Sequence, residues 1–165
     1  MRYSIVYSSR TGNTRMLADT IKAALPPEDC IYCGESSPEA LTADRIYVGF
    51  WTDKGHCDSQ TADFLEAVTD QEIFLFGTAG FGGAPDYFNT ILARTQKKLP
   101  RSAKLVGSYM CQGKMPMSVR ERYEKMKKSP VPIPRMDEML ANFDRALSHP
   151  DDADLSALRE QVATL

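Results

Sequence analysis

Short apolar runs alternate with segments of helical spacing along the first two thirds of the chain. Residues 3–7 form an apolar run, and residues 17–25 then place an apolar side chain at every third or fourth position. The run predicts a buried strand, and the spacing predicts a helix that packs one face against a core. This order repeats as far as residue 110. It predicts a parallel α/β sheet, because parallel neighbours need crossover connections that helices usually supply.

Four more apolar runs predict the remaining strands. Between them, Phe64, Leu65 and Val68 mark one helix, and Pro85 opens another. The segment 52–59, ahead of the first of these helices, is expected to be a loop. The runs themselves are short and rich in β-branched or aromatic residues, at positions 31–33, 45–51, 72–77 and 103–110.

The region after the fifth predicted strand is long. Its extended segment, 111–134, contains a basic helix for which Ser118 and Glu121 predict a capping box. The basic residues of segment 120–128 fit either a solvated helix face or a docking surface for an acidic partner. These residues are Arg120, Arg122, Lys125, Lys127 and Lys128.

Two helices are expected at the end of the chain. The apolar spacing over residues 136–147 predicts the helix that closes the fold, and residues 154–165 predict a short C-terminal helix.

Amino-acid composition limits the classes to which the protein can belong. With 165 residues and 42% hydrophobic content, residues 1–165 are expected to form one domain with a substantial core. The formal net charge of −2 gives no sign of nucleic-acid binding, and no apolar run reaches the length of about 20 residues that spans a membrane. Cys30 and Cys33 have C-x-x-C spacing, but the residues between them indicate a strand. Both are therefore expected to be buried thiols of a protein in the reducing cytoplasm.

The segment between the first strand and the first helix is rich in hydrogen-bonding groups. Ser9, Thr11, Asn13 and Thr14 carry hydroxyl or amide groups, and Gly12 lets the backbone close tightly. The helix that follows adds unpaired N–H groups and a dipole that favours an anion. Because four such side chains exceed the needs of a helix cap, the segment predicts a phosphate-binding loop. The alternative is an ordinary capped turn between strand and helix.

This loop resembles the phosphate loop of the flavodoxins, T-x-T-G-N-T. It has neither the G-x-G-x-x-G spacing of dinucleotide-binding proteins nor the Gly-Lys-Ser/Thr ending of a triphosphate loop. The resemblance implies a three-layer, doubly wound, five-stranded parallel sheet of order 2-1-3-4-5, with FMN at the switch point as is usual for flavodoxins. The matching residues are Ser9, Arg10, Thr11, Gly12, Asn13 and Thr14.

Aromatic residues mark two more strand ends, and ligands of such sheets bind beyond the carboxyl ends of the strands. Trp51, the only tryptophan, ends the third predicted strand, and Phe81 follows the fourth among glycines. Either aromatic alone would indicate core packing, but together with the phosphate loop they predict a site for a planar ring with a phosphate tail.

The resemblance implies that both segments are flavin loops. Trp51 would stack on the flavin, the Lys54–Gly55 peptide would be the one able to flip, and backbone groups of the second loop would meet the edge of the ring. Arg10 is a cation that many flavodoxins lack, and its side chain is expected to point to solvent or to pair with the phosphate. The first loop comprises Trp51, Thr52, Asp53, Lys54 and Gly55, and the second Thr78, Ala79, Gly80, Phe81 and Gly82.

No serine triad, carboxylate pair or metal cluster stands out in the sequence, so the cofactor is expected to supply the chemistry. The resemblance thus implies an FMN-binding electron-transfer protein that serves a redox partner protein, with no catalytic residue and no metal. One alternative is an FMN-dependent reductase of a small molecule such as a quinone. Another is a regulatory or binding module that keeps the flavodoxin fold without the flavin.

Overall fold

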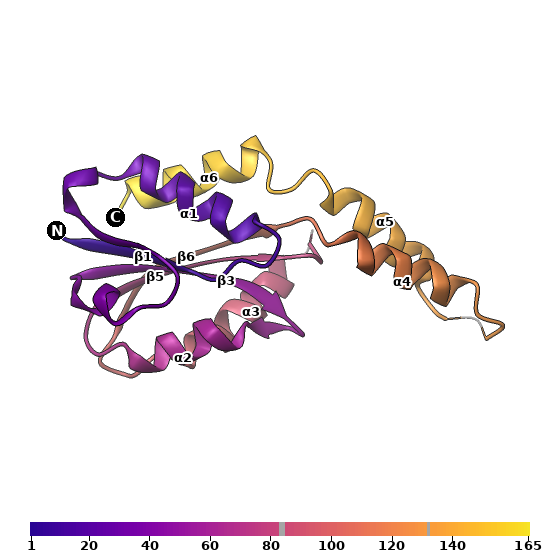
Figure 1. Ribbon diagram of the computed structural model, residues 1–165, viewed down its shortest axis with the longest axis horizontal. Coiled ribbons are helices and arrows are strands. Elements are labelled where there is room, and N and C mark those ends of the chain that lie inside the picture. The colour runs from indigo at the N-terminus through magenta and orange to yellow at the C-terminus, as the bar shows by residue number, and fades with distance from the viewer. Residues whose placement is uncertain (83–84, 132) are drawn as a thin grey trace.

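A five-stranded parallel sheet forms the centre of the protein in a computed structural model that describes residues 1–82, 85–131 and 133–165. The strand order is β2-β1-β3-β5-β6 (Figure 1). Counted along the chain over the parallel strands alone, this is the order 2-1-3-4-5, so the predicted doubly wound sheet is confirmed. The strands are β1 (Tyr3–Tyr7), β2 (Cys30–Gly34), β3 (Arg45–Asp53), β5 (Glu72–Ala79) and β6 (Lys104–Gln112).

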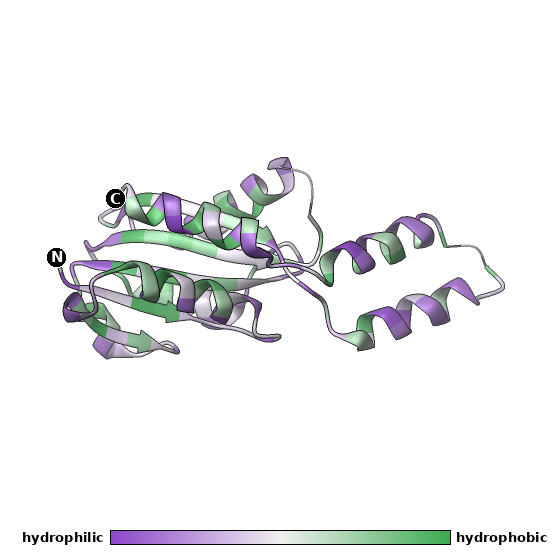
Figure 2. Ribbon diagram, turned by 90° about the horizontal axis from the view of Figure 1, so that it is seen from above, coloured by the Kyte–Doolittle hydropathy of each residue, from purple (hydrophilic) through white to green (hydrophobic). Residues whose placement is uncertain are grey.

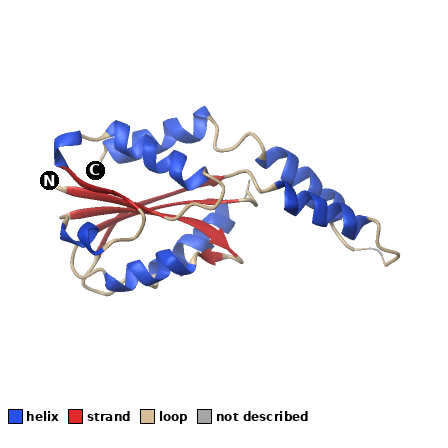
Figure 3. Cartoon of the chain, in the orientation of Figure 1, coloured by secondary structure: helices blue, strands red, loops and turns tan. Residues whose placement is uncertain are grey.

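Helices cover both faces of this sheet, which gives the three expected layers (Figure 3). One face carries α1 (Asn13–Ala24) and α6 (Asp152–Ala163), and the other carries α2 (Ser59–Ala67) and α3 (Pro85–Gln96). Two short 3₁₀ turns, Pro27–Asp29 and Pro38–Thr42, complete the connections around β2.

The central strands are buried on both faces. In β1, Ile5 belongs to the core under α1 and α6, whereas its neighbour Val6 belongs to the core under α2. Burial on two sides removes the need for polar positions, so such strands read as continuous apolar runs. The green strands at the centre of Figure 2 show this pattern.

A hairpin replaces the loop that was expected over residues 52–59. Strand β3 continues to Asp53 and pairs antiparallel with the short β4 (His56–Cys57). The two residues of the turn, Lys54 and Gly55, have φ angles of +52° and +81°. Positive φ at both positions is the geometry of a type I′ turn, which matches the twist of the strands that it joins. The expectation of a loop was therefore wrong.

Two antiparallel helices, α4 (Met117–Lys127) and α5 (Met136–Ala146), project beyond the end of the sheet as an arm (Figures 1 and 2). The prediction that the helix over residues 136–147 closes the fold was wrong, because α6 packs beside α1 and takes that role. Helix α5 instead buries Met136 and Phe143 in the arm, where α4 contributes the buried Tyr123.

The start of α4 also differs from the prediction. The helix begins at Met117 with Pro116 in the capping position and no side-chain cap, so Ser118 and Glu121 form no capping box. Because the helix starts one residue before Ser118, this side chain lies within its first turn. Pro132 of the extended segment 111–134 lies outside the described residues. No helix in the described part of the chain has the length and apolarity to cross a membrane.

Candidate functional site

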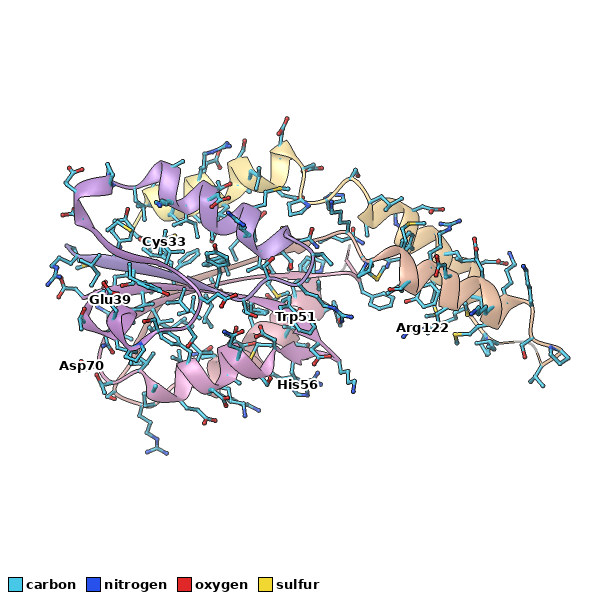
Figure 4. The ribbon with its side chains drawn as sticks, viewed as in Figure 1. Cys33, Glu39, Trp51, His56, Asp70 and Arg122 are labelled. Atoms are coloured by element: carbon cyan, nitrogen blue, oxygen red, sulfur yellow. The ribbon has the colours of Figure 1, made fainter. Side chains whose placement is uncertain are left out.

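A cavity of about 240 Å³ opens at the carboxyl ends of β1, β3 and β5. It is the place where the strand order reverses, which is the usual ligand position in an open α/β sheet. Figure 4 shows Trp51 at the end of the sheet that faces the arm. Sixteen residues were predicted from the sequence to bind the cofactor, and eleven of them line the cavity: Arg10, Thr11, Asn13, Trp51, Thr52, Lys54, Gly55, Thr78, Ala79, Gly80 and Phe81.

The other five predicted residues do not line the cavity, and the side chains of two of them make hydrogen bonds that stabilise the loop. The Ser9 hydroxyl oxygen accepts hydrogen bonds from the N–H groups of Gly12 and Arg15, at 3.1 and 3.4 Å. The Thr14 hydroxyl is fully buried and donates to the carbonyl oxygen of Phe50 at 3.0 Å. These side chains hold the loop in shape and fasten α1 to β3. The five residues outside the cavity lining are Ser9, Gly12, Thr14, Asp53 and Gly82.

The predicted phosphate loop presents unsatisfied backbone donors. Among the described residues, the N–H groups of Thr11, Asn13 and Thr14 have no hydrogen-bond acceptor. Gly12 has a φ of +89°, which a residue with a side chain adopts only under strain, and the space beside its Cα is open. An anion placed at this end of α1 would satisfy the free donors and lie at the positive end of the helix dipole.

Arg10 connects the phosphate loop with the aromatic part of the cavity. Its side chain is exposed, as expected, but the guanidinium carbon lies 5.5 Å from the ring centroid of Trp51. A cation over an indole face is attracted by the ring quadrupole. A planar ligand that stacks on this face of Trp51 would therefore displace Arg10, whose guanidinium would then be free to pair with an anion.

Buried hydrogen bonds fix the predicted first flavin loop, Trp51–Gly55, in place. The carboxylate of Asp58 is buried at the N-cap of α2, where it accepts from the N–H of Thr61 at 3.1 Å and from the N–H of Trp51 at 3.3 Å. The Thr52 hydroxyl donates to the carbonyl of Thr78 at 2.8 Å and so joins the two predicted flavin loops. Spacing along the chain does not reveal Asp58 as a positioning residue, because an N-cap aspartate is ordinary at a helix start.

Arg94 of α3 holds the turn of the β3–β4 hairpin. Its guanidinium donates to the Gly55 carbonyl at 3.1 Å. This contact spans 39 positions of sequence and could not be read from a motif. It places the Gly55 carbonyl toward α3, so in this conformation the oxygen already accepts a hydrogen bond.

In the predicted second flavin loop the carbonyls of Ala79 and Gly80 accept hydrogen bonds, whereas the N–H groups of Gly80 and Phe81 are free among the described residues. The Gly80 carbonyl accepts from the side-chain amides of Gln112 at 2.9 Å and Asn142 at 3.1 Å, and the Ala79 carbonyl accepts from a backbone N–H. In the part of the chain that the structure describes, the N–H groups of Gly80 and Phe81 have no acceptor. This edge of the cavity therefore favours a ligand that carries hydrogen-bond acceptors.

The start of the arm forms a wall of the cavity that the sequence did not reveal. Gly113 packs so closely that an added Cβ would lie 2.4 Å from the Asn13 amide nitrogen, and that amide donates to the Lys114 carbonyl at 2.8 Å. Lys114 joins Arg10 and Lys54 in a cationic lining. The lining residues that sequence reasoning missed are Tyr87, Gly113, Lys114, Met115, Pro116 and Val119.

Burial shifts the pKa values of two titratable groups near the cavity. Burial raises the pKa of the Cys57 thiol, which disfavours the thiolate. Burial likewise raises the pKa of Tyr87 and keeps its phenol protonated as a donor. One group with metal-ligand chemistry, His149 with Asp151 and Asp154, lies outside the cavity, where the two carboxylates form the capping box of α6.

Together, the doubly wound sheet and the donor-rich loop at its switch point define an open α/β protein with a cavity at the usual ligand position. A family model described as a flavodoxin domain matches residues 4–163. The chain therefore belongs to the flavodoxin family. It is also 43% identical, over 176 aligned positions, to the flavodoxin-like domain-containing protein BilS of Clostridium symbiosum (strain WAL-14163), with 96% of this chain and 93% of that protein covered.

Solved structures of low sequence identity share the fold. Oxidised flavodoxin 2 from Bacillus cereus is 21% identical and aligns with a TM-score of 0.53 over 88% of this chain and 99% of that one. A flavoprotein from Lactobacillus acidophilus, solved in complex with FMN, is 13% identical with a TM-score of 0.50 over 66% of this chain and 92% of that one. At these identities the likeness establishes the fold alone.

Proposed function

We propose that this protein binds FMN non-covalently and carries electrons to or from a redox partner protein. The observation that carries this proposal is the cavity itself, where the unsatisfied donors at the start of α1 lie in the same hollow as Trp51 and Phe81. The FMN complex of the Lactobacillus acidophilus flavoprotein and the family membership of the chain support the choice of ligand. The four cysteines form no disulfide, in keeping with the proposed location in a reducing cytoplasm.

The residues present fit the two ends of FMN. The free N–H groups of Thr11, Asn13 and Thr14 suit a phosphate dianion, and Arg10 supplies a cation in the lining that Thr11 and Asn13 share. Trp51 and Phe81 offer aromatic faces to an isoalloxazine ring. The free N–H groups of Gly80 and Phe81 match the carbonyl oxygens at the pyrimidine edge of that ring.

FMN supplies the one- and two-electron chemistry when it is bound. The chain's own residues bind and orient it: the phosphate loop holds the tail, Trp51 excludes water from the ring, and the second flavin loop aligns the pyrimidine edge. Phe81 is 41% exposed, so this side of the cavity is open to a partner. An accessible ring edge is what electron exchange between proteins requires.

The flavin content of the purified protein tests the ligand. We expect FMN and not FAD, because the loop offers donors for one phosphate group and the second strand is followed by no adenosine-binding fingerprint. Acid extraction followed by chromatography identifies the flavin, and a fluorescence titration of apo-protein measures its binding. FAD as the main flavin, or apo-protein that fails to bind added FMN, would contradict the proposal.

Thr11 is expected to bond the phosphate through its hydroxyl as well as its N–H. Thr11→Ala should weaken FMN binding about tenfold, or about 1.5 kcal/mol, the lower range for a hydrogen bond to a charged group. Thr11→Ser keeps the hydroxyl and is the matched control. The dissociation constant from titration is the readout, and equal affinity of all three proteins would remove the Thr11 hydroxyl from the phosphate site.

The second candidate function is FMN-dependent reduction of a small molecule such as a quinone. The wall that Met115, Pro116 and Val119 add to the cavity favours it, because apolar side chains there could contact a flat substrate. Anaerobic stopped-flow mixing separates the two functions. A carrier passes electrons to a protein acceptor faster than to a soluble quinone, whereas multiple rapid turnovers with the quinone alone would favour the reductase.

A further inference from the structure

The arm differs in charge from the body that carries it. Residues 114–147 have a formal net charge of +3, whereas the rest of the chain has −5. The arm leaves the sheet at the end where the candidate cavity lies (Figure 1), so the positive region is beside the site and not on a remote face. Such a division of charge within one chain orients an approaching charged protein.

Two of the basic residues of α4 are used to hold α5. Arg120 pairs with Glu124 and with Asp144, and its guanidinium lies over the Phe143 ring. Lys127 pairs with Asp137 of α5 at 2.9 Å. These cations stabilise the arm, which leaves them less available to a partner.

The other basic residues of segment 120–128 take no part in the ion pairs to α5, although the Arg122 guanidinium lies 5.8 Å from the ring centroid of Tyr123. Arg122, Lys125 and Lys128 recur every three residues, are exposed, and form no ion pair with the residues that the structure describes. This spacing puts them on one side of the helix. The acidic residue Glu121 lies on the same side. Figure 4 shows Arg122 on the arm. Arg122, Lys125 and Lys128 are named the outer basic stripe below.

Hydrogen bonds fix the arm relative to the cavity. Asn142 of α5 is buried, and its amide donates to the carbonyl of Gly80 in the second flavin loop at 3.1 Å. Gln112 donates to the same carbonyl at 2.9 Å and to the Asn142 side chain at 3.0 Å. Val119, in the first turns of α4, lines the cavity. A protein bound along α4 would thus be held at a defined position beside the flavin loops.

We infer that the outer basic stripe is the docking surface for an acidic face of a protein, and the inference rests on the proposed electron-carrier function. Three cations over six residues of helix cover about 9 Å, which suits a small acidic patch on a folded protein. The body, at −5, opposes the close approach of an extended polyanion such as a nucleic acid or an anionic membrane. Electrostatic docking of this kind mainly accelerates association and weakens with salt.

The test uses holo-protein and an acidic plant-type [2Fe–2S] ferredoxin as the probe. The variant R122Q/K125Q/K128Q removes the stripe. The matched control is K22Q/K97Q/R101Q, which removes two lysines and one arginine that lie outside the arm. All three are exposed and form no ion pair with the residues that the structure describes. Calorimetry measures binding of oxidised ferredoxin, and stopped-flow absorbance measures electron transfer from reduced ferredoxin, each at 20 and 300 mM salt.

We expect the stripe variant to lose about tenfold in the rate of electron transfer and in affinity at low salt, and to lose most of its salt dependence. The control should behave as wild type, and FMN affinity and the flavin spectrum should not change in either variant. Equal losses of rate and affinity in both variants would show that the effect depends only on net charge, and would overturn the inference.

The two readouts separate this inference from the proposed function. Electron transfer that proceeds but is unaffected by the stripe variant overturns the docking surface and leaves the carrier function standing. Binding that depends on the stripe without electron transfer supports the docking surface and contradicts the carrier function. Stripe-dependent binding to phosphatidylserine vesicles, with none to ferredoxin, would assign the stripe to a membrane surface and overturn the inference.

Discussion

Trp51→Ala is expected to weaken FMN binding by about 2 to 3 kcal/mol, a rise of roughly 30- to 150-fold in the dissociation constant. The indole lines the cavity at the end of β3, and its backbone is fixed by the buried Asp58 carboxylate, so the ring is presented to the ligand in a defined position. Loss of the ring removes both the stacking contact and the apolar area that it covers. Titration of apo-protein with FMN measures the effect.

The single tryptophan gives this prediction a second readout. Fluorescence of the wild type should be strongly quenched in the holo-protein and should recover when FMN is removed. Trp51→Phe is the matched control, because it keeps an aromatic face and should lose much less affinity. Unquenched fluorescence, together with an unchanged dissociation constant for Trp51→Ala, would show that the indole packs only against the protein.

Gly49→Ala is expected to destabilise the apo-protein by about 3 kcal/mol, the upper range for overpacking a filled core. A Cβ at this position would lie 2.3 Å from the ring of Phe76 and 2.9 Å from the Thr14 methyl group. Both neighbours are fully buried, so neither can move without disturbing the contact between the sheet and α1. The midpoint of urea unfolding should fall while the slope stays constant.

Gly34→Ala supplies the comparison for this substitution. At Gly34 the nearest atom to an added Cβ is the Tyr32 hydroxyl oxygen, at 3.1 Å, the far end of a half-buried side chain in the same strand. Gly34→Ala should therefore lower the free energy of unfolding much less than Gly49→Ala does. Equal unfolding midpoints for Gly49→Ala and the wild type would mean that the packing around Phe76 is looser than these distances indicate.

The donor-rich loop before α1 and the aromatic residues at two strand ends could be identified from the sequence because their chemistry is local. Hydroxyl, amide and glycine residues between a strand and a helix indicate an anion site wherever the helix begins, since backbone donors are free at every helix N-terminus. Trp51 and Phe81 were found for a similar reason, as each directly follows a buried strand. The contacts that hold these loops were not predictable. Arg94, Asp58 and Asn142 reach the loops from other elements, and only the folded chain brings them there.

The role of the helix over residues 136–147 shows the same limit. Its apolar spacing established that one face is buried, and this was right for Met136 and Phe143. Spacing carries no information on which surface covers that face. Helix α4 covers it, which releases the position beside α1 to α6. A helix expected to close the sheet therefore became half of the arm.

The sequence by itself determined the parallel sheet, the order of strands and helices, the donor-rich loop before α1 and the aromatic residues at two strand ends. Hydrophobic periodicity and loop chemistry depend only on near neighbours in the chain, so they can be read directly. The tertiary structure decided which side chains of the phosphate loop face the cavity, that the start of the arm walls it, and which cations of α4 stay unpaired. Each of these depends on contacts between different elements, such as Lys127 of α4 with Asp137 of α5 or Gly113 with Asn13 of α1, and such contacts form only when the elements pack.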